Sequence, residues 1–182
     1  MKTNQNNNGF EYIVALGLIL LLVVSRCTSH IWNFTAVGGI ALFSAAYCTK
    51  KHTAFLVVFL GMIISDLVIG LHNQMLAVYG AYFLMVAIGF MLDADSSRTK
   101  RFLVTLTGSI SFFLITNFAV WSSGGLYPMT AGGLMQSYIM GLPFFRPQII
   151  SDVLVSFALF EVASLPATAS LAVRLKLYLS KS

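Results

Sequence analysis

Carboxylate, amide and indole side chains stand near the ends of long apolar runs, where polar groups are rare. Asp66 lies only about 7 Å inside the end of its run, if that run is a helix rising 1.5 Å per residue. Asn117 and Trp121 are four residues apart and therefore share one face of a helix. Such groups could bind a small molecule through hydrogen bonds and through flat ring faces that carry a polar tip.

The full set of candidate ligand-binding residues gathers toward the same ends of the apolar runs: His30, Trp32, Asn33, Asp66, His72, Tyr79, Tyr82, Asn117, Trp121, Tyr127, Arg146 and Asp152. The aromatic members suit a ring-bearing ligand, and His30 and Arg146 could take a metal centre or an anionic group. Polar groups inside a membrane usually face a protein interior or a water-filled cavity. The set therefore predicts a polar and aromatic pocket.

Structural roles are the alternative for several of these residues. Asp66 could form a buried ion pair with Arg146, and the only role of Asp152 could be to cap the start of its helix. The two tryptophans could belong to an interfacial aromatic belt, and the histidines could be ordinary loop residues. Glu161, nine residues beyond Asp152, could bond a neighbouring helix or line a relay.

The composition excludes an ordinary soluble domain. Hydrophobic residues make up 58% of the 182 residues and charged residues only 9%, against about 25% charged in typical soluble domains, and the mean hydropathy is +0.85. The apolar runs are continuous, as in Ile13–Val24 and Phe55–Ile64, and do not alternate with a period of two as in a transmembrane barrel. The sequence therefore predicts an all-α polytopic membrane protein.

Six apolar segments approach the length of about 20 residues that a helix needs to cross a bilayer. We predict them at about residues 10–26, 34–49, 53–71, 75–92, 102–121 and 149–177. Pro166 should kink the last segment or end its outer part. The prediction is thus a disordered tail at 1–9 and a single transmembrane domain at 10–179, with an outer lid segment at 122–148 that folds back over the helix ends as a short helix or lid.

The distribution of lysine and arginine orients these segments. If the N-terminus is cytoplasmic, nine of the 11 cations fall on the inside, and only Arg26 and Arg146 fall outside. Cytoplasmic loops of membrane proteins carry such an excess, so the sequence predicts both termini in the cytoplasm (N-in/C-in). Orientation also accounts for the net charge of +5, and no nucleic-acid partner is expected.

Small residues occur at helical spacing in the second and the sixth predicted segments. They are Gly38, Gly39, Ala41, Ala45 and Ala46, and then Ala163, Ala167 and Ala169. Small side chains let helix backbones approach closely. These positions serve either internal packing or docking onto a partner membrane protein.

Five ordered blocks carry a resemblance to known proteins: Asn33–Gly38 with Ala41–Phe43, Ser65–Leu67 with Gly70–His72, Thr116–Trp121, Tyr127–Thr130 with Gly133–Leu134, and Pro143–Phe145 with Asp152. Over about residues 12–160 the chain resembles a family of uncharacterised bacterial integral membrane proteins, a domain-of-unknown-function family. That family is similar to the substrate-binding S components of energy-coupling-factor (ECF) vitamin transporters, and most of all to solitary cobalamin S components. The resemblance implies six helices, an outward-facing pocket, and ligand contacts from His30, Asp66, Tyr79, Tyr82 and Arg146.

The leading functional hypothesis is a substrate-binding transport subunit for a vitamin or similar small nutrient, a corrinoid such as cobalamin among them. It would act without catalysis or a cofactor, in the lipid bilayer of a bacterial inner membrane. The sequence contains no Walker motif, so uphill uptake would need a separate ATPase, with an ECF-type transmembrane subunit as a further partner.

Other functional classes remain as alternatives. A metal-ion transporter could use His30, His72, Asp66 and Asp152. A membrane enzyme is disfavoured, because the sequence contains no nucleophile elbow, metalloprotease helix or paired-carboxylate motif. A structural or assembly protein of the membrane is the remaining alternative.

Overall fold

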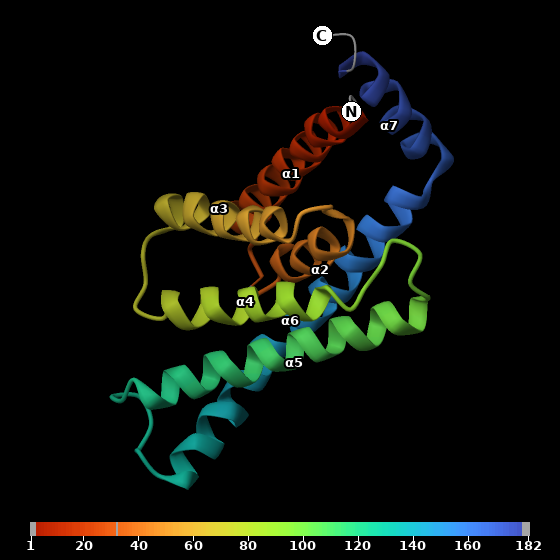
Figure 1. The fold of residues 1–182 in the computed structure, drawn as a ribbon. Helices are drawn as coiled ribbons and strands as arrows, with labels where there is room; N and C mark the ends of the chain where they lie inside the picture. The colour runs from red at the N-terminus through yellow and green to blue at the C-terminus, as the bar shows by residue number, and fades with distance from the viewer. Residues whose placement is uncertain (1–2, 32, 180–182) are drawn as a thin grey trace.

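A computed structural model describes residues 3–31 and 33–179, and in that part the chain is helical without strands (Figure 1). The helices are α1 (Thr3–Thr28), α2 (Val37–Tyr47), α3 (Lys51–Ile69), α4 (Met75–Gly89), α5 (Arg98–Ser122), α6 (Ala131–Ser164) and α7 (Pro166–Leu179). The connections within this part are short, and α3, α4 and α5 run back and forth side by side (Figure 1). The chain ends of α1 and α7 lie together on one side of this layer (Figure 1).

The first five helices correspond to the first five predicted segments, whereas the last segment differs. Helix α6 begins at Ala131 and not near residue 149, so most of the expected lid at 122–148 is helical. The side chain of Thr130 caps this start by accepting a hydrogen bond from the Gly133 N–H at 3.1 Å. As predicted, the chain breaks at Pro166: α6 ends at Ser164, Leu165 is extended, and Pro166 begins α7, a position where the missing N–H of proline is harmless. The expected tail at 1–9 is part of α1 from Thr3 onward.

Helix α2 occupies the centre of the bundle. It contacts α1, α3, α4, α5 and α6, and nine of its 11 residues are buried, from Val37 to Ala45. A helix that is apolar on every face is stable only when it is surrounded, and the sequence of α2 has no polar face. The elements around α2 therefore position the side chains of the candidate site.

Glycines in α2 and α4 allow this central packing. A Cβ atom on Gly39 would lie 2.7 Å from the backbone nitrogen of Ser156 in α6, and a Cβ atom on Gly89 would lie 2.7 Å from the Cβ of Ala45. The small residues of α2 thus serve internal packing, as one of the two hypotheses held. In the last predicted segment, Ala167 is exposed.

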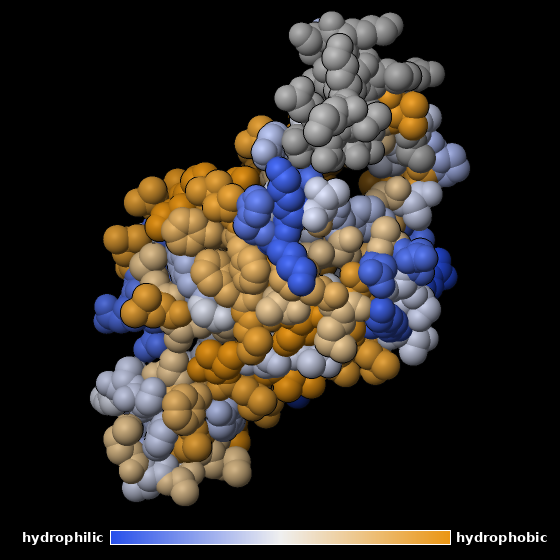
Figure 2. All heavy atoms as spheres, viewed as in Figure 1, coloured by the Kyte–Doolittle hydropathy of each residue, from blue (hydrophilic) through white to orange (hydrophobic). Residues whose placement is uncertain are grey.

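Four helices are long and apolar enough to cross a membrane: α1 (through Gly9–Thr28), α3, α5 and α6. Helices α2 and α4 are apolar but shorter, with 11 and 15 residues. Large apolar side chains are exposed along the long helices, for example Leu16 and Leu20 at 65% and Leu67 at 71%. Figure 2 shows hydrophobic side chains over most of the visible face, with hydrophilic ones gathered near the start of α3 and near the α3–α4 and α4–α5 connections. An apolar surface of this extent suits a lipid environment and makes a membrane protein plausible.

At the helix ends opposite the α3–α4 connection, two acidic side chains form bonds between neighbouring elements. Glu161 in α6 accepts a hydrogen bond from Arg98 at 3.2 Å and lies 3.7 Å from Arg101, so it bonds a neighbouring helix. Glu11 in α1 is buried and accepts hydrogen bonds from the Thr49 hydroxyl and from the backbone N–H of Lys50. Lys50 is the N-cap of α3 and has no side-chain cap of its own, so Glu11 caps α3 from another helix.

Candidate functional site

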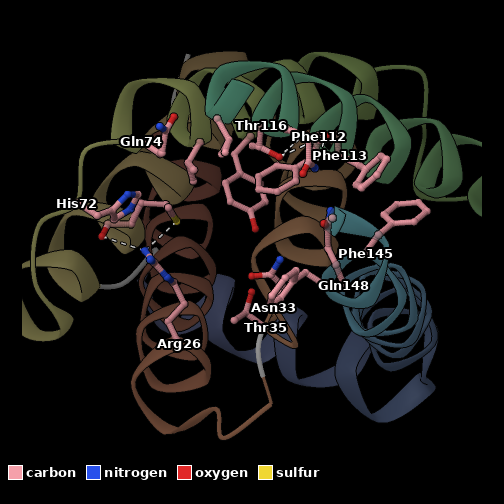
Figure 3. A pocket seen from close by; sticks show the side chains of 17 residues that line it. Arg26, Asn33, Thr35, His72, Gln74, Phe112, Phe113, Thr116, Phe145 and Gln148 are labelled. Atoms are coloured by element: carbon pink, nitrogen blue, oxygen red, sulfur yellow. Dashed lines mark hydrogen bonds between the residues drawn. The ribbon is translucent and has the colours of Figure 1, made fainter. Parts of the chain in front are cut away.

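A cavity of about 380 Å³ opens among the helix ends that adjoin the α1–α2, α3–α4 and α5–α6 connections. Figure 3 shows Phe112, Phe113 and Thr116 on one side and Asn33 and Thr35 on the other, with Arg26 and His72 at one end and Phe145 and Gln148 at the opposite end. The described lining residues combine amides, hydroxyls and aromatic rings with one permanent charge: Arg26, Asn33, Thr35, Met62, His72, Gln74, Val78, Tyr82, Phe112, Phe113, Thr116, Asn117, Val120, Gly141, Phe144, Phe145 and Gln148.

The permanent charge in this wall belongs to Arg26, which is held in a buried network. Its Nη2 lies 2.6 Å from Oδ1 of Asp66, which is fully buried. Its Nη1 donates to the Ser65 hydroxyl at 2.8 Å and contacts Met62. The Tyr79 hydroxyl donates to the other carboxylate oxygen of Asp66 at 2.7 Å. Helices α1, α3 and α4 are thereby joined directly behind the cavity wall.

The ion pair that sequence analysis offered for Asp66 was assigned to the wrong partner. Arg146 is exposed on α6 and lines no part of the cavity, whereas Arg26 pairs with Asp66. The physical reason is helix depth. Arg26 lies in the last turn of α1 and Asp66 in the last turn of α3, and these two helices pack against each other. The structural role proposed for Asp66 stands, with a different cation.

Asp152 lies deep in α6, immediately behind Gln148. Its Oδ2 accepts hydrogen bonds from Ser109 of α5 at 2.7 Å and from Gln148 at 3.5 Å, and only 1% of the residue is exposed. Its other carboxylate oxygen packs on Gly38 of α2, where a Cβ atom would collide with it. The alternative that Asp152 caps its helix is wrong, because α6 begins at Ala131, some 21 residues earlier.

Two polar side chains of the α5 wall donate hydrogen bonds to carbonyl oxygens of their own helix. Asn117 donates from Nδ2 to the carbonyl oxygen of Phe113 at 2.8 Å, and its Oδ1 packs on Gly141 of α6. The Thr116 hydroxyl donates to the carbonyl oxygen of Phe112 at 2.9 Å. Both bonds are the local side-chain to backbone type that polar residues form within a helix. The second N–H of the Asn117 amide takes no part in these bonds, so this wall keeps a donor as well as oxygen acceptors.

Aromatic rings enclose the middle and one end of the cavity. The rings of Tyr82 and Phe112 have centroids 4.4 Å apart, and those of Phe113 and Phe145 have centroids 4.7 Å apart. The Phe145 and Phe113 rings come from α6 and α5, so the ring pair joins the two helices. Flat apolar faces of this kind bind planar rings by stacking or by edge contacts.

The structure distributes eleven of the twelve sequence-predicted residues over three places. Asn33, His72, Tyr82 and Asn117 line the cavity. Asp66, Tyr79 and Asp152 lie behind its wall and hold residues that line it. The remaining described members are outside the cavity: His30, Trp121, Tyr127 and Arg146. Trp32 lies outside the described residues.

Two of the residues outside the cavity have other roles. Trp121 donates from its indole nitrogen to the carbonyl oxygen of Pro128 at 3.0 Å and so fastens the α5–α6 connection. His30 lines a second cavity of about 430 Å³, which lies between the end of α1, the α1–α2 connection and Val155 of α6. Thr35 lines both cavities, so the α1–α2 connection separates them.

Sequence reasoning missed several lining residues, of which Arg26 and Gln148 matter most. Arg26 was counted only as an outside cation, although a single arginine at the end of an apolar helix signals a need for a counter-charge. Gln148 precedes Asp152 by four residues, so on a helix the two share one face. That spacing could have been recognised had residues 131–148 been assigned to a helix.

The described residues offer no cluster of three or more histidine, cysteine, aspartate or glutamate side chains that could hold a metal ion. His30 and His72 line different cavities, and Asp66 and Asp152 are engaged with different helices. In this part of the chain the four residues considered for a metal site are therefore not brought together.

The helices and the cavity define an all-helical protein with four helices able to cross a membrane and a polar, aromatic-lined cavity near one set of helix ends. The chain belongs to the family of unknown function DUF6580, whose family model matches residues 6–173. No curated protein and no solved structure matches the chain.

Proposed function

We propose that this protein is a substrate-binding membrane subunit for uptake of a vitamin or similar small nutrient, with a pocket that faces outward. The observation that carries the proposal is the cavity itself. It combines four amide side chains, two threonines and several aromatic rings within a bundle of predominantly apolar helices. Such convergence of a few polar groups on an aromatic-lined hollow is typical of small-molecule sites.

The proposal includes the way in which the chain crosses the membrane. Six membrane passes with both termini in the cytoplasm would place nine of 11 cations inside and the cavity outside. Helices of 11 and 15 residues rise only about 17 and 22 Å, less than the roughly 30 Å of a bilayer core. The passes of α2 and α4 would therefore include residues of the adjoining connections. The membrane is proposed to be the inner membrane of a bacterium.

The cavity volume favours a ligand smaller than a corrinoid. About 380 Å³ is near the lower end of the roughly 300–1,000 Å³ found for pockets that hold drug-sized ligands, and a corrinoid is much larger than such ligands. A single ring system with a few polar substituents fits this space. Active uptake would require an energy source outside this chain, for which an ECF-type transmembrane subunit and its ATPases are the proposed partners.

The test combines detection of a retained molecule with uptake. Native mass spectrometry of gently purified protein should detect a bound small molecule, and cells that express the protein should take up one of a panel of vitamins that includes cobalamin. Gly141→Ala should reduce both by at least about tenfold, because the added Cβ would strike the Asn117 amide and displace it. The matched control is Gly132→Ala in the same helix, where the nearest atom is 3.8 Å away. Absence of both retention and uptake would overturn the proposal.

A further inference from the structure

The two buried aspartates of the bundle are held in opposite ways. Asp66 is fully buried and has a cation, Arg26, at 2.6 Å. Asp152 is only 1% exposed, and its hydrogen bonds within the described residues join it to Ser109 at 2.7 Å and to Gln148 at 3.5 Å. Both of these partners are uncharged. Asp152 is therefore as deeply buried as Asp66 but has no compensating charge.

The second oxygen of the Asp152 carboxyl group faces an apolar surface. It packs on Gly38 of α2, and the same point of α2 lies close to the methyl group of Met85 in α4. Both Gly38 and Met85 are buried. Burial in such a place disfavours an ionised carboxylate unless a cation or several hydrogen-bond donors compensate for it.

The ionisable side chains of the surrounding helices do not supply that cation. About two turns further along α6, Arg101 of α5 lies over the Phe160 ring at 4.5 Å and is 3.7 Å from Glu161. The other ionisable residues of α2, α4, α5 and α6 are Arg98, Lys100 and Arg146, which are exposed, Tyr47 beside Phe160, Tyr138, which donates to a carbonyl group of α5, Tyr79, which donates to Asp66, and Tyr82, which lines the cavity. Helix α7 begins at Pro166, beyond this level of α6. In the part of the chain that the structure describes, no cation pairs with Asp152.

A protonated carboxyl group accounts for the hydrogen bonds around Asp152. The Ser109 hydroxyl lies 2.7 Å from Oδ2 of Asp152 and 3.0 Å from the carbonyl oxygen of Thr105, and a hydroxyl has one hydrogen to donate. If Oδ2 carries a proton, Asp152 donates to Ser109, and Ser109 donates to Thr105. An ionised Asp152 would depend on one hydroxyl and one long amide contact, and a buried carboxylate with so little compensation takes up a proton.

Gln148 links this group to the cavity. It lines the cavity one helical turn before Asp152, and its amide nitrogen lies 3.5 Å from the carboxyl oxygen, which is long for a hydrogen bond. An ionised Asp152 would hold this amide more tightly, because hydrogen bonds to charged groups are shorter and stronger. A protonated Asp152 leaves the Gln148 amide freer to bond a molecule in the cavity.

We propose that Asp152 is a proton-binding site behind the cavity: its carboxyl group holds a proton at neutral pH, and the cavity binds its ligand more tightly while that proton is bound. The proton comes from water in the cavity and returns to it when Asp152 ionises. Because linkage is reciprocal, a ligand in the cavity strengthens proton binding by the same factor. The proton site goes beyond the proposed function, whereas its coupling to a ligand rests on that function.

Infrared spectroscopy tests the proton site without any ligand. Purified full-length protein, in a detergent that contains no ester groups, should show the C=O stretch of a protonated carboxylic acid at neutral pH. This band should disappear in Asp152→Asn. The matched control is Asp95→Asn, which removes an exposed acid from the α4–α5 connection and should leave the band unchanged.

Ser109→Ala keeps this test decisive if Asp152→Asn does not fold. The variant removes the hydroxyl that accepts the proton of Asp152, so the band should shift in frequency and remain present. A wild-type spectrum without the band, a band that persists in Asp152→Asn, or a band that Ser109→Ala does not shift would overturn the proton site.

The pH dependence of uptake tests the coupling. Cells that express the protein, supplied with the same panel of vitamins, should lose uptake as the outside pH is raised above neutral, by up to about tenfold per pH unit, the limit for one linked proton. The sign follows from the acid form, which favours binding and is lost as the pH rises. Asp152→Asn should remove this dependence, whereas Asp95→Asn should keep it.

The two measurements separate the possible failures. If vitamin uptake in Asp152→Asn depends on pH as it does in the wild type, the coupling is overturned and the proposed function stands. If no vitamin is taken up, the proposed function fails and the coupling fails with it, while the infrared band alone decides whether Asp152 holds a proton.

Discussion

Arg26 near the end of α1 and Asp66 near the end of α3 form an ion pair of 2.6 Å in which the carboxylate is fully buried and the guanidinium reaches the cavity. Removing one partner of a buried pair leaves the other charge without compensation, which costs about 3–5 kcal/mol. Arg26→Met and Asp66→Asn should therefore each lower the melting temperature of the detergent-purified protein strongly.

Arg146, the other cation that the predicted topology places outside, provides the control for this pair. Arg146→Gln removes an exposed charge and should leave the melting temperature nearly unchanged. The double variant Arg26→Met/Asp66→Leu removes both charges and should recover most of the lost stability. If Asp66→Asn melts like Arg146→Gln, the pair does not stabilise the fold.

Gly38 in α2 provides a second prediction, on packing. A Cβ atom at this position would collide with the carboxylate of Asp152 and lie 2.8 Å from the methyl group of Met85. Gly38→Ala should destabilise the protein by about 1–3 kcal/mol, because overpacking forces neighbouring groups to move. Gly80→Ala in α4 is the matched control, since a Cβ there meets no atom within 4 Å and alanine favours helices. Chemical or thermal unfolding of both variants tests the difference, and equal stability would contradict it.

Glu11 provides a third prediction, on helix capping. Its carboxylate accepts from the Thr49 hydroxyl and the Lys50 N–H, which is otherwise uncapped at the start of α3. Glu11→Ala should cost about 1–3 kcal/mol, the usual effect of leaving buried hydrogen-bonding groups without a partner. Glu11→Gln should cost less, because an amide oxygen can still accept. Asp95→Ala removes an exposed acid from the α4–α5 connection and serves as the control in the same unfolding assay.

The orientation can be read from two exposed connections. In a background without Cys27 and Cys48, Asn73→Cys places a thiol in the α3–α4 connection and Asp95→Cys places one in the α4–α5 connection. A maleimide that does not cross membranes should label the first in intact cells and the second only after permeabilisation. The reverse pattern would show that the cavity faces the cytoplasm, and labelling of both would contradict the proposed passes.

The positions of the first five helices were predictable because long apolar runs are separated by short charged or polar connections. Helix α6 was not, since Pro143 and Pro147 indicate a break and yet both lie inside it. A single proline removes one backbone bond, and the neighbouring helices can compensate for it. Sequence spacing does not convey that compensation.

The sequence predicted where the candidate site lies better than it predicted which residues line it. Asn117 and Asn33 were found because amides near helix ends are rare in apolar chains. Arg26 was missed because its partner depends on the relative depth and rotation of α1 and α3, which a one-dimensional pattern does not contain. Trp121 and Arg146 were included by residue type, but each side chain is directed elsewhere by its own helix.

The two prolines inside α6 also determine how the cavity wall can deform. Neither Pro143 nor Pro147 has an N–H, so the carbonyl groups of Ile139 and Pro143, one turn earlier, lose their helical partner. Both gaps fall beside Gly141, Phe145 and Gln148, which line the cavity. Helix α6 therefore bends most easily beside the cavity, because prolines inside a helix are the usual sites of kinks. A bend of α6 at these prolines would change the shape of the cavity, because the lining residues of α6 lie on both sides of Pro143.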